Sequence, residues 1–153
     1  MEITVRKATE EDARRVAAAL RESDRLEIEA LNLDPAFALM DSFAGSDEAY
    51  AAYVDGEAAM IFGVGETMFS DEAFVWALGT DVCNWAPLAM VRIGREMVGR
   101  FLETYPRLTN WCDARYDKTI KWLRLLGFTI GEPEPYGAKG ALFRKLSIQR
   151  KEA

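Results

Sequence analysis

The stretch from Asn110 to Ile130 constrains the fold more than any other segment, because it combines a strand, a turn, a helix and a second strand. Apolar residues at helical spacing give the helix one apolar face: Ile120, Leu123 and Leu126. Asp117 is positioned to cap the helix by accepting a hydrogen bond from a first-turn N–H. Gly127 ends it, because glycine enters the left-handed region without a Cβ clash. Phe128 then begins the next strand.

The rest of the chain alternates between strand-like and helical patterns. Alternating or continuous apolar residues predict strands over 2–7, 49–54, 57–64, 73–78, 108–112 and 141–146. Apolar residues at helical spacing predict helices over 10–23, 24–31, 34–45, 87–105 and 117–126. The turn Asp55-Gly56 gives the clearest hairpin signal, and 131–140 is a loop rich in Pro and Gly. We therefore expect one α/β (α+β) domain over 1–148, followed by a solvated basic tail over 149–153.

The composition excludes several classes of protein. The 153 residues include no histidine, which excludes Ser-His-Asp and Cys-His catalysis and histidine-ligated metals. Cys83 and Cys112 have no second pair to complete a zinc site, so we expect no metal. The net charge of −6 argues against a nucleic-acid partner. No apolar run approaches the about 20 residues of a membrane helix, and the N-terminus lacks a secretion signal. We expect a cytoplasmic protein without a membrane partner.

The order of the predicted elements resembles that of the GNAT acyltransferases. The resemblance is carried by Asp113-Ala114-Arg115, Ile120, Trp122-Leu123 and Leu126-Gly127-Phe128-Thr129-Ile130. Within that superfamily these residues look most like the GNAT-like proteins of tailed bacteriophages, some of which are labelled internal virion protein A. The resemblance implies a mixed central sheet of six to seven strands, splayed between the fourth and fifth strands and flanked by helices. For a phage protein it implies the host cytoplasm or the virion interior, with other virion proteins as partners.

GNAT enzymes hold acetyl-CoA where the fourth and fifth strands part, which by resemblance are 73–78 and 108–112 here. The diphosphate lies on N–H groups at the start of the next helix. The candidate cofactor contacts are Leu78, Thr80, Trp85, Ala86 and Leu88. The loop 79–87 lacks the family's (Arg or Gln)-x-x-Gly-x-(Gly or Ala) spacing. It carries Asp81, whose charge opposes a diphosphate, and Pro87, which lacks an N–H.

The transfer needs a base for the amine and a proton donor for the leaving thiolate. Among the candidate carboxylates, Glu72 has the best position, at the start of the central strand. Where many GNAT enzymes carry a proton-donating Tyr, this chain has Leu123, so the role is either empty or filled by another residue. Tyr116 is the candidate donor, and the alternative is that it only packs on the surface at the start of the helix. The candidate substrate-binding residues are Glu29, Trp76, Trp111 and Tyr136. The three aromatic residues among them could equally belong to the core.

Two functions stay open. The first is an acyltransferase that moves an acetyl group from acetyl-CoA to a small-molecule or protein amine by direct attack. Its oxyanion would be held by a backbone N–H near Leu78. The second is a GNAT-fold protein without turnover that a phage uses as a virion component or interaction module. Trp85 and the apolar hairpin are compatible with the edge of a homodimer.

Overall fold

The computed structural model describes residues 1–68 and 71–151. The helices are α1 (Glu10–Ala18), α2 (Glu22–Ala30), α3 (Pro35–Ala44), α4 (Pro87–Thr104) and α5 (Asp117–Leu125), with a short 3-10 helix η1 (Asp81–Trp85). The strands are β1 (Ile3–Lys7), β2 (Glu48–Val54), β3 (Glu57–Glu66), β4 (Ala73–Gly79), β5 (Arg107–Asp113), β6 (Thr129–Ile130), β7 (Glu134–Tyr136) and β8 (Ala141–Gln149).

All eight strands belong to one mixed sheet in the order β1-β2-β3-β4-β5-β8-β6, with β7 beside β8. Only β4 and β5 run parallel, and their pairing consists of Ala73 with Leu108 and Phe74 with Thr109. Beyond these two pairs the strands part, which confirms the predicted splay. The strand count exceeds the predicted six to seven because of β7, which pairs with β8 and lies in the segment 131–140 that we expected to be a loop.

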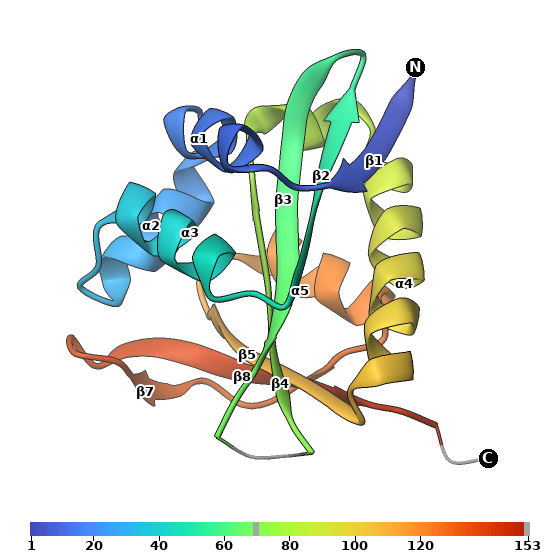
Figure 1. Ribbon diagram of the computed structural model, residues 1–153. Coiled ribbons are helices and arrows are strands. Elements are labelled where there is room, and N and C mark those ends of the chain that lie inside the picture. Colours follow the sequence, from blue (N-terminus) through green and yellow to red (C-terminus); the bar gives the residue numbers. More distant parts are fainter. Residues whose placement is uncertain (69–70, 152–153) are drawn as a thin grey trace.

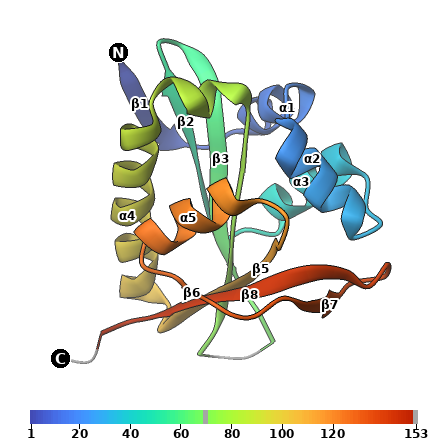
Figure 2. The same ribbon diagram turned by 180° about the vertical axis from the view of Figure 1, so that it is seen from behind.

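Helices cover both faces of this sheet (Figures 1 and 2). Helices α1, α2 and α3 pack on one face, where Val16, Ile28 and Leu39 form a core with Trp76 and Leu78 of β4. Helices α4 and α5 pack on the other face around a larger core that includes Phe101 and Leu123. The gap between β4 and β5 is therefore open to both layers.

The predicted break between the helices 10–23 and 24–31 lies a few residues earlier in the structure, because α1 ends at Ala18 and α2 begins at Glu22. Contacts with the end of β4 determine its position. Leu20 forms a β-bridge with Thr80, and the Arg21 N–H donates to the Gly79 carbonyl oxygen over 2.9 Å. These bonds hold the chain extended between the two helices. Sequence periodicity does not give the exact position of this break, because that position depends on a strand more than fifty residues away.

The helix in the central stretch begins differently from the prediction. Tyr116 occupies the N-cap position of α5 without a side-chain bond, and Asp117 is the first helical residue. The predicted Asp117 cap is therefore wrong, although a carboxylate in the first turn still favours the helix dipole. Gly127 has φ +107°, which agrees with its predicted role as the helix stop.

Two glycines inside α4 have different surroundings. A Cβ on Gly94 would lie 2.6 Å from Leu126 Cδ2, so the missing side chain allows α4 and the end of α5 to pack closely. A Cβ on Gly99 would meet no atom within 4 Å. Close packing therefore explains Gly94 but not Gly99.

Substituting the two glycines should have opposite effects on stability. Gly94→Ala should lower the free energy of unfolding by about 1–3 kcal/mol, because the added methyl group forces the buried Leu126 side chain out of its present position. Gly99→Ala should raise it by up to about 1 kcal/mol through higher helix propensity. Chemical denaturation of both variants beside the parent chain measures the difference, and equal effects at the two sites would contradict this explanation.

Candidate functional site

The parted strands leave backbone groups of β4 facing the gap. The Val75 carbonyl oxygen accepts a hydrogen bond from Asn110 Nδ2 over 2.7 Å, and the Gly79 N–H donates to Asp24 Oδ2 over 2.8 Å. Alternate residues of a strand direct their backbone groups to the same edge. The N–H and C=O of Ala77, which lies between these two residues, therefore point into the gap, whereas those of Leu78 point toward β3.

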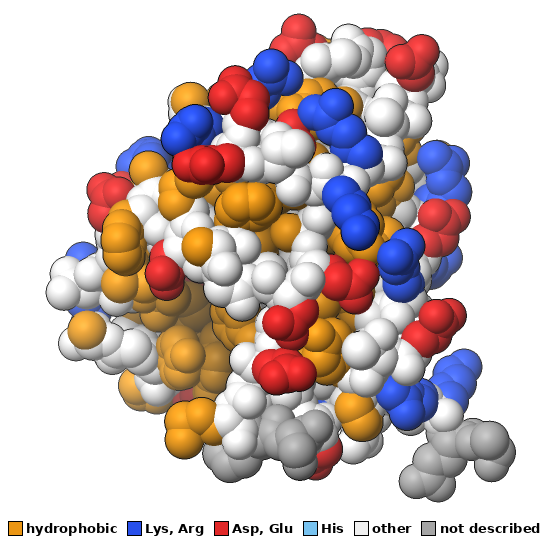
Figure 3. Space-filling view, viewed as in Figure 1, with side chains coloured by type: hydrophobic (Ala, Val, Ile, Leu, Met, Phe, Trp, Pro, Cys, Tyr) orange, Lys and Arg blue, Asp and Glu red, His pale blue; other side chains and the backbone are white. Residues whose placement is uncertain are grey.

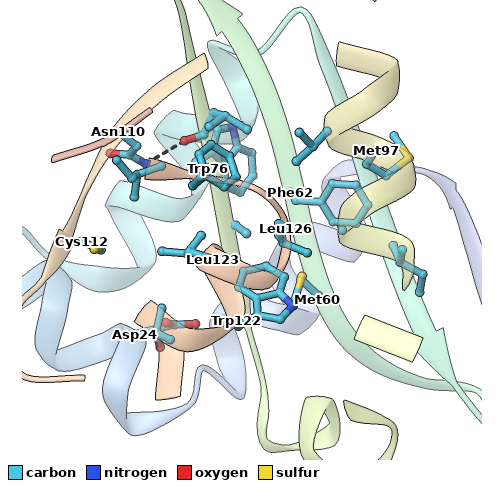
Figure 4. A pocket seen from close by; sticks show the side chains of 18 of the residues that line it. Asp24, Met60, Phe62, Trp76, Met97, Asn110, Cys112, Trp122, Leu123 and Leu126 are labelled. Atoms are coloured by element: carbon cyan, nitrogen blue, oxygen red, sulfur yellow. Dashed lines mark hydrogen bonds between the residues drawn. The ribbon is translucent and has the colours of Figure 1, made fainter. Parts of the chain in front are cut away.

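A cavity of about 90 Å³ lies against this edge, between the sheet and helices α4 and α5. Its apolar wall includes Phe62, Ile93, Leu123 and Leu126. Figure 4 shows Asp24 and Asn110 on one side of the pocket and Met97 on the other, with Leu123 and Leu126 between them. The cavity thus begins in the apolar layer of α4 and α5 and ends at polar groups of α2.

Helix α2 supplies two carboxylates to that polar end. Asp24 Oδ2 lies 2.7 Å from Arg21 Nε and also accepts the Gly79 N–H. One turn later, Glu27 Oε2 accepts the Asp113 N–H over 2.9 Å. Asp113 itself pairs with Arg115 over 2.7 Å. Glu27 has no ion-pair partner among the described residues, so its charge is the one left without a cation.

The surroundings of Glu27 raise the pKa of its carboxyl group to about 7. Burial is the main cause, and the negative charges of Asp24 and Asp113 add to it. The Asp113 N–H and the Arg21 guanidinium act in the opposite direction. A carboxylate with a pKa near neutrality is suited to take a proton from an entering group at physiological pH.

Two of the predicted substrate-binding residues line the cavity, and a third, Tyr136, stacks on one of them. Trp76 and Trp111 are both wall residues. Trp76 is held by a 2.7 Å hydrogen bond from its Nε1 to Ser46 Oγ. Trp111 stacks on Tyr136, with ring centroids 4.2 Å apart and planes inclined by 17°. The fourth, Glu29, lies on the outer side of α2 and pairs with the exposed Arg25.

The predicted catalytic residues lie outside the cavity wall. Glu72 lies at the end where β4 and β5 are still paired, and it accepts a hydrogen bond from Thr109 Oγ1 over 2.6 Å. Tyr116 lies at the start of α5, with the Arg115 guanidinium 5.2 Å from the centre of its ring. Burial raises the pKa of the Tyr116 hydroxyl.

The predicted cofactor contacts surround the segment between β4 and α4. The Leu78 side chain is buried in the core beneath α1–α3, and Thr80 Oγ1 accepts the Val82 N–H at the start of η1. Ala86 is the N-cap of α4 and makes no side-chain cap bond. Trp85 and Leu88 are exposed. The helical turn η1 occupies the place where the family carries its glycine-rich loop.

Sequence reasoning missed Glu27. Asp24, Glu27, Ile28 and Leu31 lie at spacings of three and four residues and therefore share one helix face. The sequence therefore contained a signal for a buried carboxylate: Glu27 lies on the same helix face as the apolar residues. The many other acidic residues of 22–29 concealed it.

Solved structures similar to this chain are acetyltransferases. An N-acetyltransferase from Staphylococcus aureus Mu50 matches with a TM-score of 0.71 and 14% identity, over 97% of this chain and 99% of that one. A GNAT-family acetyltransferase from Streptococcus pneumoniae gives 0.62 and 16%, over 97% and 99%. A GNAT-superfamily phosphinothricin acetyltransferase from Sinorhizobium meliloti, in complex with AcCoA, gives 0.68 and 15%, over 97% and 89%.

The chain therefore has the GNAT fold over nearly its whole length, as the sequence predicted. No model of a known protein family and no curated protein sequence matches it. Across 1–68 and 71–151, no group of three or more acidic or cysteine side chains is placed to hold a metal ion. No helix in the same residues is long and apolar enough to cross a membrane.

The raised pKa of Glu27 predicts how stability depends on pH. Because this pKa rises from 4.5 to about 7 on folding, the folded chain holds more protons than the unfolded chain between those values. Raising the pH through this window therefore lowers the free energy of unfolding. Glu27→Gln removes this loss, so the variant should be more stable than the parent by on the order of 2 kcal/mol near pH 8.

Urea unfolding of both proteins across the pH range measures this effect, and the difference should approach zero near pH 4. Glu29→Gln is the matched control, because Glu29 is exposed and paired with Arg25. It should show no such trend. A difference between the parent and Glu27→Gln that is independent of pH would contradict the assigned environment.

Proposed function

We propose that this protein is an acyltransferase that moves an acetyl group from acetyl-CoA to an amine. The observation that carries the proposal is the gap between β4 and β5, where the backbone of Ala77 faces a cavity that ends at the carboxylate of Glu27. The gap offers N–H and C=O groups with which a linear amide-containing chain can pair, in the way that an additional strand pairs with a sheet edge. The carboxylate supplies the base that an amine requires.

The gap is well suited to the thioester end of acetyl-CoA. The segment 79–87 is less well suited to its diphosphate. When bound, acetyl-CoA supplies the activated acyl group. Ala77 would hold the acyl arm through its backbone, and the apolar wall around Leu123 would exclude water from it. At the other end, η1 and Asp81 replace the glycine-rich loop, so N–H groups of the first turn of α4 are the remaining anion contacts.

Glu27 acts as the general base in this proposal. An amine enters as an ammonium ion and must give up one proton before its nitrogen can attack. Glu27 takes that proton. The nitrogen then bonds to the acyl carbon, the carbon–sulfur bond breaks, and the second nitrogen proton ends on the departing sulfur. Glu72, the base predicted from the sequence, is the competing assignment.

Binding of the donor is tested by thermal unfolding with and without acetyl-CoA. A ligand that binds only the folded state should raise the melting temperature by roughly 5–10 °C at about a hundred times its Kd. The enzyme proposal is wrong if millimolar acetyl-CoA leaves the melting temperature unchanged.

The assignment of the base is tested by the rate and its pH profile. Glu27→Gln should lower kcat by roughly a hundredfold, while the shift in melting temperature with acetyl-CoA is retained. In the parent, kcat/KM should fall as the pH drops below about 7, where Glu27 becomes protonated. Glu72→Gln provides the comparison, since a larger loss there would assign the base to Glu72.

A second candidate function is an interaction protein of this fold that performs no transfer. Two features of α5 favour it: Leu123 cannot donate a proton, and Trp122 Nε1 donates to the Met90 carbonyl oxygen over 3.3 Å and so joins α5 to α4. The resemblance to phage proteins belongs to this candidate. Detection of the protein in purified virions, together with no response to acetyl-CoA, would support it over the enzyme.

A further inference from the structure

The side of the gap opposite α4 and α5 is hollowed. Figure 3 shows a depression with mostly hydrophobic walls between helices α2 and α3 and the strand β8. The hairpin of β7 and β8 approaches the end of α2, since a Cβ on Gly137 would lie 2.9 Å from Leu31 Cδ2. Trp111 lines the cavity and also stacks on Tyr136 of this hairpin, so it connects the two.

Aromatic rings from three strands line this side. Trp111 of β5 stacks on Tyr136 of β7, and the Tyr136 ring lies 5.6 Å from that of Phe143 in β8, inclined by 51°. Phe143 is fully buried and packs against Tyr136, whereas Trp111 and Tyr136 remain partly exposed. A stacked pair with accessible ring surface can take a further ring or apolar body beside it.

A single unpaired carboxylate lies close to these rings. Glu27 accepts the N–H of Asp113, which is two residues beyond Trp111 on β5. Residues two apart on a strand are separated by about 6.6 Å and point to the same face. Three carboxylates meet here (Asp24, Glu27 and Asp113), but only two guanidinium groups (Arg21 and Arg115) pair with them. The surplus negative charge of ionised Glu27 therefore favours a cation.

From this arrangement we infer the class of acceptor: a compound that carries an amine beside an aromatic or similarly flat apolar body. Its ammonium lies at Glu27 and its ring against Trp111 and Tyr136. This inference rests on the proposed function, since it names the acceptor for the same gap. Polyamines lack the apolar body, and neutral aromatic alcohols lack the cation.

Calorimetric titration with three probes in the absence of coenzyme tests the inference. Phenethylamine carries both features, 2-phenylethanol keeps the ring without the cation, and spermidine keeps the cations without the ring. Phenethylamine should bind at least roughly tenfold more tightly than either of the others. Glu27→Gln should weaken the binding of phenethylamine and leave that of 2-phenylethanol unchanged.

Variants of the hairpin ring provide the matched comparison. Tyr136→Ala should weaken phenethylamine binding by roughly tenfold, whereas Tyr136→Phe, which keeps the ring, should bind it like the parent. Both variants should keep the thermal shift with acetyl-CoA. That shift distinguishes the two proposals: its absence in the parent would remove the acyltransferase and with it the role of acceptor, and phenethylamine binding would then show only a binding site for aromatic amines.

Two results would overturn the inference. One is a parent protein that acetyl-CoA stabilises but that binds phenethylamine no better than spermidine. The other is phenethylamine binding of equal strength in the parent and in Tyr136→Ala.

Discussion

The partial pairing of β4 and β5 is the constraint on which the rest of the structure depends. Two residue pairs hold the strands together at one end, and the parting beyond them leaves main-chain groups without strand partners. Buried groups of this kind need hydrogen-bond partners. The Asn110 side chain donates a hydrogen bond to the Val75 carbonyl oxygen. Asp24 accepts from the Gly79 N–H, and the Arg21 N–H donates to the Gly79 carbonyl oxygen. These groups therefore replace the hydrogen bonds that a paired strand would make.

The same contacts also position Glu27, the proposed base. Asp24 fixes the first turn of α2 to the end of β4, and Glu27 follows one turn later above the end of β5. Burial between two other carboxylates raises the pKa of Glu27. The same bonds that satisfy the open strand edge therefore place a carboxylate of nearly neutral pKa beside it.

The fold was largely predictable because its determinants are local. Periodicity, the Asp55-Gly56 turn and the Leu126-Gly127-Phe128 helix stop predicted most elements within a few residues. The position of the break between α1 and α2 was missed because the distant end of β4 determines it. The wrong Asp117 cap was a local error of one residue, since Tyr116 occupies the N-cap position. In the site, Trp76 and Trp111 were foreseen because they lie on the two parting strands. Glu27 was not, since its importance comes from Asp113, which is 86 positions away.

The direction of the Ala77 backbone has an evolutionary consequence. The donor half of the proposed site uses main-chain atoms and aliphatic packing, which most point mutations leave in place. The acceptor half uses side chains from α2, β5 and the β7–β8 hairpin, each of which a single codon change can replace. In the proposed enzyme, single mutations can therefore change the acceptor contacts while the main-chain contacts proposed for the acyl group stay in place.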